Sequence, residues 1–161
     1  MPGKNNKKIL VDLRSDTVTH PSQKMRNAMY QAKLGDDVYG DDPTVNRLQE
    51  KAAEMMGKEA GLFVSSGTQG NLGAMLAHCG RGEAVIVGDK SHIYTNEAGG
   101  ASTLGGLVLK PVPNNSDGNL DPDSIQEISA PGDYHKSPAT LICIENTHNQ
   151  CGGVVLSVED S

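Results

Sequence analysis

The 161-residue sequence predicts an α/β domain built on a largely parallel sheet. Short apolar runs of strand length alternate with segments whose apolar residues recur at helical spacing, which favours parallel strands joined by helices. The run from Ala84 to Val87 is apolar throughout, as expected of a strand covered on both faces. Polar clusters directly follow three of the apolar runs, and ligands of such sheets bind beyond the carboxyl ends of the strands.

The elements predicted along the chain follow this alternation. We expect a flexible tail over 1–8, a short extended run over 9–13, a helix over 21–34 that Pro21 opens and Gly35 ends, an acidic loop over 36–42, a helix over 43–56, a strand over 62–64, a helix over 67–79, a strand over 84–87, a loop or short weak helix over 97–106, a strand over 107–112, a helix over 122–130 and a strand over 140–144. Asp42-Pro43 and Asp121-Pro122 each supply a capping carboxylate and a first-turn proline.

One helix carries a continuous apolar stripe, which we expect to be core. Its members are Val45, Leu48, Ala52, Met55 and Met56.

Composition bounds the class of protein. The length suits one domain with a single core, expected over 9–161. The net charge is −6 and only Lys4, Lys7 and Lys8 form a basic cluster, which argues against nucleic-acid or membrane partners. No stretch approaches the roughly 20 apolar residues of a membrane span. The N-terminus lacks the apolar run of a signal peptide, so we expect a cytosolic, cytoplasmic protein. Three unpatterned cysteines indicate reduced thiols.

The stretch from Leu62 to Leu72 is the first candidate for a ligand site. We interpret it as a strand, a tight turn at Ser66-Gly67-Thr68 and the start of a helix. Unpaired backbone N–H groups and the helix dipole make such a junction suited to a phosphate. A serine-capped helix without a ligand explains the residues equally well. The stretch lacks a P-loop lysine and the third glycine of a dinucleotide fingerprint, which disfavours nucleoside triphosphates and NAD.

Metal sites are weaker alternatives, and we expect no metal. His92 follows a predicted strand and can stack on a planar ligand or carry a proton near neutral pH. Glu145 and His148 have the Glu-x-x-His spacing of di-iron helices, but they follow a strand. The acidic loop over 36–42 departs from the calcium-binding pattern, because Val38 stands where a carboxylate is needed.

Several motifs in order resemble the threonine aldolases. These motifs are Asp12 to Thr19, Gly35 to Thr44, Ser66 to Asn71 and Glu145 to Asn149, and the resemblance runs from about Ile9 to Leu156. The family consists of pyridoxal-phosphate (PLP) enzymes of the aspartate-aminotransferase fold that are related to the β-eliminating lyases. The resemblance therefore implies a PLP-dependent, transferase-like large domain with a mostly parallel sheet.

The resemblance also implies cofactor contacts. Gly67 and Thr68 match the turn that holds the cofactor phosphate, with Ser66 beside them, and His92 matches the histidine that stacks on the pyridine ring. Gly70 stands where the family usually has alanine, at a cost in helix propensity of about 1 kcal/mol.

Substrate contacts follow in the same way. Ser15 matches a residue near the substrate carboxylate, and His135 matches a second active-site histidine near the substrate hydroxyl. Tyr39 resembles a residue at the subunit contact, where a neighbouring copy completes the site. The implied reaction is retro-aldol cleavage of L-threonine or L-allo-threonine to glycine and acetaldehyde, with His92 or His135 as the base. The implied assembly is a homo-oligomer, a dimer or tetramer.

The family's Schiff-base lysine, the aspartate facing the pyridine nitrogen and the carboxylate-binding arginines match positions after Ser161. Lys90 lies two residues before His92, but the resemblance does not give it the Schiff-base role. We therefore expect residues 9–161 to be the truncated N-terminal part of a larger PLP-binding domain. The alternative is a non-catalytic fragment that pairs with a full-length subunit.

Overall fold

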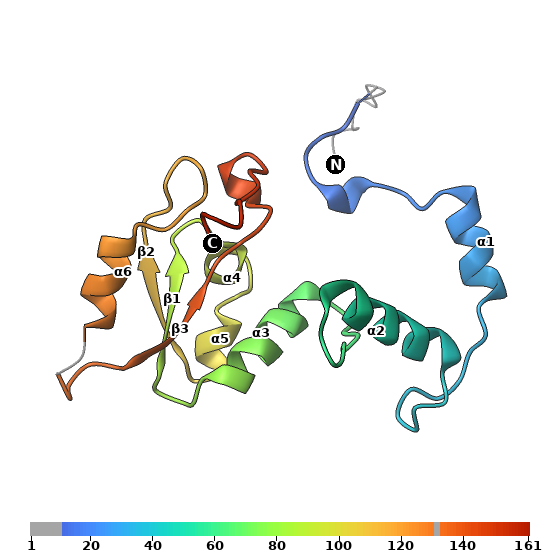
Figure 1. Ribbon diagram of the computed structural model, residues 1–161, viewed down its shortest axis with the longest axis horizontal. Helices are drawn as coiled ribbons and strands as arrows, with labels where there is room; N and C mark the ends of the chain where they lie inside the picture. The colour runs from blue at the N-terminus through green and yellow to red at the C-terminus, as the bar shows by residue number, and fades with distance from the viewer. Residues whose placement is uncertain (1–10, 131–132) are drawn as a thin grey trace, which may run out of the picture. The chain divides into compact units, whose positions relative to one another are not determined.

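The computed structural model describes residues 11–130 and 133–161, and the chain divides into two units, Met1–Phe63 and Val64–Ser161. Figure 1 labels the elements of both units. The tail expected over 1–8 and the start of the extended run expected over 9–13 lie outside the described residues. No helix in the described ranges is long and apolar enough to cross a membrane.

The first unit contains the 3-10 helix η1 (Asp16–Val18) and the helices α1 (Gln23–Gln31) and α2 (Pro43–Met56). Both ends of α2 agree with the prediction. The Asp42 carboxylate accepts hydrogen bonds from the backbone N–H groups of Thr44 and Val45, and Gly57 ends the helix in the left-handed region at φ 61°. At α1 the cap is Ser22, so the helix starts later than predicted.

The apolar stripe of α2 is not core in this structure, so that prediction is wrong. Met55 is 74% exposed and Met56 73% exposed, and Leu48 is also exposed. Ala53, one position away from the predicted stripe, is the buried residue of this helix. Helical spacing specifies which side chains share a face, but it does not supply the surface that covers them.

The second unit holds a three-stranded parallel sheet in the order β2-β1-β3. Its strands are β1 (Ala84–Gly88), β2 (Val108–Val112) and β3 (Ala139–Cys143). All five residues of the central strand β1 are buried, as its continuous apolar run predicts. Pro111 has no N–H to donate, which suits its place in β2 at the edge of the described sheet.

Helices lie on both sides of this sheet (Figure 1). They are α3 (Gly67–His78), α4 (His92–Thr95), α5 (Gly100–Thr103) and α6 (Pro122–Ser129), with the 3-10 helix η2 (Asn149–Cys151) after β3. The core consists of Met75, Cys79, Val85, Val87, Ala101 and Leu107, contributed by β1, the helices α3 and α5 and their flanks. Three residues connect the carboxyl end of β1 at Gly88 to the start of α4 at His92.

The strand predicted over 62–64 is absent, because no ladder partner pairs with this segment among the described residues. Leu62 and Phe63 are exposed, and the Phe63 N–H donates to the Gln49 side chain at 2.8 Å. The weak segment predicted over 97–106 contains the single turn of α5. The remaining strand and helix predictions agree with the structure to within one or two residues at most ends.

Candidate functional site

The amino end of α3 leaves two backbone donors unused. Ser66 is the N-cap, and its hydroxyl accepts a hydrogen bond from the Gln69 N–H at 3.1 Å. The Ser66 carbonyl accepts from the Gly70 N–H. The N–H groups of Gly67 and Thr68 have no acceptor among the described residues. A side chain at Gly67 would meet open space, so the approach to these donors is clear. This arrangement suits an anionic group.

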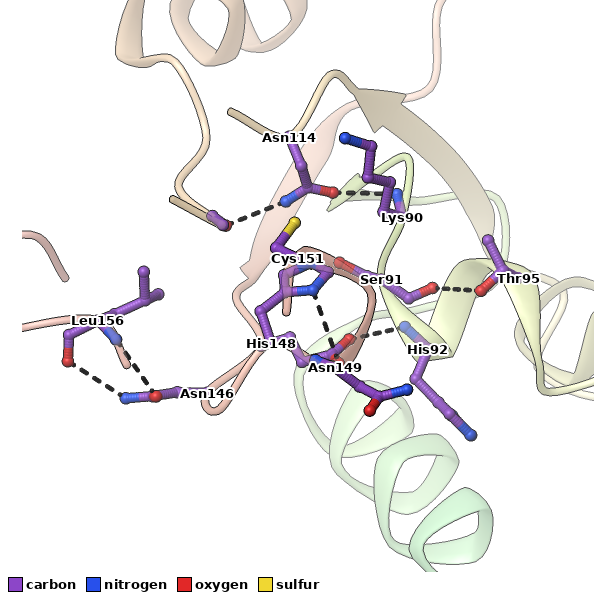
Figure 2. Close-up of polar contacts among 12 residues, drawn as sticks. Lys90, Ser91, His92, Thr95, Asn114, Asn146, His148, Asn149, Cys151 and Leu156 are labelled. Carbon is purple, nitrogen blue, oxygen red and sulfur yellow. Dashed lines mark hydrogen bonds and ion pairs between the residues drawn. The ribbon is translucent and has the colours of Figure 1, made fainter. Parts of the chain in front are cut away.

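Two polar clusters that the sequence separates by 53 positions meet at His92. The Glu145 carboxylate, just after β3, accepts a hydrogen bond from the His92 N–H at 2.7 Å and another from the Asn149 N–H at 3.1 Å (Figure 2). The N-cap residue of α4, Ser91, makes no side-chain cap of its own. Glu145 therefore supplies the acceptor for the start of α4, which anchors the histidine backbone.

The His92 ring is held by a residue that the sequence analysis does not identify. Its Nδ1 lies 2.8 Å from Oε1 of Glu97. The same oxygen accepts a hydrogen bond from the Asn71 amide at 2.7 Å. The Glu97 side chain is only 4% exposed, whereas that of His92 is 51% exposed. A histidine and a glutamate five residues apart match no known sequence motif, and Asn71 is 26 positions from Glu97. No local sequence pattern therefore indicates that these three residues form a group.

A cavity of about 200 Å³ adjoins these residues. Its lining comes from α3, from the β1–α4 junction and from the exit of β3, through Asn71, Ser91, His92, Ile93, Ile144, Glu145 and Asn146. The prediction that the ends of separate strands form one rim is thus confirmed for the clusters at 89–92 and 145–149. The residues from Ser65 to Thr68 do not line the cavity; Asn71, on the following turn of α3, does.

A buried asparagine fixes the loop that carries His92. Asn114 accepts a hydrogen bond from the Lys90 N–H at 2.9 Å and donates its amide to the Gly118 carbonyl at 3.0 Å (Figure 2). Its own N–H donates to the Asp89 carboxylate at 2.9 Å. The loop is therefore tied to the segment after β2, which limits its movement.

His148 lies in the interior rather than in the cavity. It is fully buried, and neither ring nitrogen has a hydrogen-bond partner in the described part of the chain. The Glu145 carboxylate is 3.9 Å from its Nδ1, too far for a hydrogen bond. Across residues 11–130 and 133–161, no three histidine, cysteine, aspartate or glutamate side chains gather as a metal site requires.

His135 lies on the loop between α6 and β3, ahead of the amino end of that strand. Its Nδ1 is 3.0 Å from the Asp133 carboxylate, and its ring stacks against Tyr134. The His135 N–H, and then its side chain, donate to that carboxylate and lower the pKa of Asp133. The structure does not bring His135 next to His92, which follows the carboxyl end of β1. Its catalytic role stays a prediction.

Ser15 and Tyr39 belong to the first unit. Ser15 is the N-cap of η1, where its hydroxyl accepts a hydrogen bond from the Thr17 N–H at 3.2 Å. Tyr39 is exposed in the acidic loop, where Asp36 accepts hydrogen bonds from the N–H groups of Val38 and Tyr39. Their substrate-binding roles stay predictions.

Comparisons with known proteins agree with this geometry. The family model described as beta-eliminating lyase matches residues 12–160. The low specificity L-threonine aldolase of Escherichia coli is 53% identical over 140 residues, which cover 87% of this chain and 42% of that protein. The low-specificity L-threonine aldolase 1 of Arabidopsis thaliana is 54% identical over 152 residues, which cover 92% of this chain and 42% of that protein.

A solved structure from Listeria monocytogenes has the same fold. That protein, named as a candidate L-allo-threonine aldolase, superposes with a TM-score of 0.64 at 21% identity, covering 84% of this chain and 36% of the other. The chain spans about two fifths of the length of the two curated relatives.

Proposed function

The chain belongs to the beta-eliminating lyase family, and we propose that it forms the cofactor-facing part of a PLP-dependent threonine aldolase. The reaction is the cleavage of L-threonine or L-allo-threonine to glycine and acetaldehyde. One observation carries the proposal: His92, Glu145 and Asn71 of α3 line one cavity, and Glu145 binds the His92 backbone. The names of the Escherichia coli and Arabidopsis relatives support the reaction class.

The amino end of α3 and the His92 side chain at the cavity fit PLP. Gly67 and Thr68 offer two unpaired backbone donors, as a phosphate group requires, and no side chain obstructs them. The half-exposed imidazole of His92 offers a flat face for a pyridine ring. We assign the phosphate to Ser66, Gly67 and Thr68 and the ring to His92. When bound, PLP supplies an electron sink for the carbanion left after carbon–carbon cleavage.

His92 also serves as the base in this proposal. Its Nδ1 is engaged by Glu97, so Nε2 is the nitrogen that can take the proton of the substrate β-hydroxyl, directly or through one water. As that proton leaves, the oxygen–hydrogen electrons form the carbonyl of acetaldehyde, and the bond between Cα and Cβ breaks. Protonation at Cα then gives glycine.

The proposed roles of three further residues, Ser15, His135 and Tyr39, come from the family resemblance. On that basis we assign binding of the substrate carboxylate to Ser15 and contact with the substrate hydroxyl to His135. Tyr39 takes part in a homo-oligomeric contact, and its exposure is compatible with that role. Because this chain spans about two fifths of the curated relatives, the Schiff-base lysine and the carboxylate-binding arginines are assigned to no residue here.

The direct test measures acetaldehyde and glycine released from L-threonine and L-allo-threonine in the presence of PLP. We expect residues 1–161 by themselves to release neither product, and the same residues joined to the remaining segment of the Escherichia coli relative to release both in equal amounts. Absence of turnover in the joined protein would contradict the proposed reaction. Turnover by residues 1–161 alone would show that they need no lysine from outside them.

A binding test addresses the phosphate assignment separately. Gly67→Pro removes one N–H donor at the first position of α3, where proline is tolerated. Ser66 already has the extended backbone that a following proline requires, with φ −156° and ψ 156°. We expect wild-type protein to bind PLP at least about tenfold more tightly than pyridoxal, which lacks the phosphate, because charge-assisted hydrogen bonds are strong.

The Gly67→Pro variant is expected to lose most of this preference while its circular dichroism stays unchanged. Gly73→Ala is the matched control, since it lies in the same helix and its new methyl group meets no neighbour. An unchanged preference in Gly67→Pro would remove the amino end of α3 from the site.

The second candidate function is a non-catalytic chain that pairs with a full-length subunit. The exposed methionines of α2 favour it, because an uncovered apolar face is suited to contact with another chain. Co-purification of a tagged chain with a full-length threonine aldolase subunit tests this candidate. Recovery of the tagged chain alone would exclude it.

A further inference from the structure

Glu97 is a buried carboxylate that contacts two side chains, those of His92 and Asn71. No lysine or arginine in the described part of the chain forms an ion pair with it. Its side chain is 4% exposed, and its Oε1 lies 2.8 Å from Nδ1 of His92 and 2.7 Å from the Asn71 amide nitrogen. A buried carboxylate is costly unless hydrogen bonds satisfy it. The ring of His92 and the amide of Asn71 provide those bonds.

The geometry limits which nitrogen of His92 carries the hydrogen. An ionised carboxylate only accepts hydrogen bonds, so a short contact between Oε1 and Nδ1 requires the hydrogen to be on Nδ1. Asn71 donates to the same oxygen and cannot satisfy Nδ1 itself. In the neutral ring, the hydrogen on Nδ1 leaves Nε2 as the acceptor. No described residue bonds to Nε2.

We propose that Glu97, oriented by Asn71, is a positioning residue that holds neutral His92 in the tautomer with hydrogen on Nδ1. Glu145 anchors the histidine backbone through its N–H, and Glu97 fixes the orientation of the ring. Nε2 is thereby kept as the nitrogen available to a ligand. The use of Nε2 as a base rests on the proposed function, but the tautomer itself does not.

Long-range proton–nitrogen NMR of the imidazole rings tests this directly, on the whole chain without cofactor or substrate. At a pH well above the ordinary histidine pKa, we expect the His92 nitrogen shifts to show hydrogen on Nδ1 in at least about a tenfold excess over Nε2, since a bond to a charged acceptor is strong. Equal populations, excess hydrogen on Nε2 or a ring that stays doubly protonated would each overturn the proposal. This measurement needs no variant.

The Glu97→Gln variant keeps the shape of the side chain and removes its charge. We expect it to reduce the Nδ1 preference of His92 about tenfold, because a glutamine amide can either accept from Nδ1 or donate to it. If the glutamine variant does not fold, Glu97→Asp replaces it in the same test, because it keeps the charge but shortens the side chain and so lengthens the contact with Nδ1. An unchanged tautomer ratio in a folded variant overturns the role of Glu97.

An exposed pair supplies the matched control. Asp133 contacts Nδ1 of His135 at 3.0 Å, with both side chains largely solvated. Asp133→Asn is expected to change the signals of His135 and leave those of His92 unaltered. Failure of PLP binding would contradict the proposed function without affecting this result, and an incorrect tautomer would overturn the inference without affecting PLP binding.

Discussion

Gly88 ends β1 at a point where no side chain fits. A Cβ at this position would lie 2.2 Å from Oδ1 of Asn114, well inside contact distance. The Asn114 amide cannot simply move, because it is bonded to the Lys90 N–H and to the Gly118 carbonyl. The backbone around the His92 loop therefore depends on a single glycine.

Gly88→Ala is expected to lower the free energy of unfolding by about 1–3 kcal/mol, because overpacking forces the bonded amide out of place. Urea denaturation measures this change. Gly73→Ala is the control, since nothing lies within 4 Å of its new methyl group, and it should raise the free energy of unfolding by about 1 kcal/mol through helix propensity. Equal effects of the two variants would contradict the packing argument.

Sequence reasoning at this scale identifies part of the site. His92 is predicted from its place after a buried strand, and the structure puts it at the cavity. Glu97 and Asn71 are missed, because each looks like an ordinary polar residue in its own segment. Their importance comes from sharing one hydrogen-bonded oxygen across 26 positions of sequence.

The helix starts at α2 and α6 are built alike, with an aspartate cap followed by proline. The Asp42 carboxylate accepts backbone N–H bonds from Val45, Gly35 and Thr44, and these bonds lower its pKa. The pKa of Asp121 is lowered first by the Ser124 hydroxyl and then by the Ser124 N–H. The two caps couple helix stability to their own ionisation.

A carboxylate whose pKa is lower in the folded than in the unfolded protein makes the fold more stable as the pH rises. The charged caps stabilise the fold above the unfolded aspartate pKa of about 3.9, and this contribution is lost as the pH falls through the lower folded values. We expect the stability difference between pH 6 and low pH to shrink in Asp42→Asn and Asp121→Asn, since asparagine caps a helix without titrating. Denaturation across pH measures it. An undiminished difference in both variants would contradict the role of the two caps.

One face of the sheet in the second unit is only half covered. On this face α6 lies against β2, whereas Ile142 of β3 is 48% exposed. An open cavity of about 270 Å³ adjoins β3, lined by residues of that strand with Ile86 and Ser129. Among the described strands, β3 forms an edge that carries no proline, in contrast to β2. Such an edge is prone to pair with another chain.

We expect the isolated chain to self-associate through β3 in a concentration-dependent way, visible by size-exclusion chromatography with light scattering. Ile142→Lys should weaken this association at least about tenfold, because covering an exposed isoleucine at a contact contributes up to about 1.5–3 kcal/mol and a charge on an edge strand opposes pairing. Val108→Lys on the other edge is the control. A monomer at all concentrations, or equal effects of both variants, would contradict the role of β3.

Local features follow from the amino-acid order alone: the alternation of strands and helices, the capped ends of α2, the buried central strand and the order of the polar clusters. These depend on periodicity, caps and turn residues, which are local properties. Which side chains meet, and which stay uncovered, depends on the packing of the folded chain. The bond from His92 to Glu145 spans 53 positions. The contacts of Glu97 with His92 and with Asn71 depend on how α3 and α4 pack in this unit. Strand pairing and helix packing bring such residues together, and no spacing in the sequence records them.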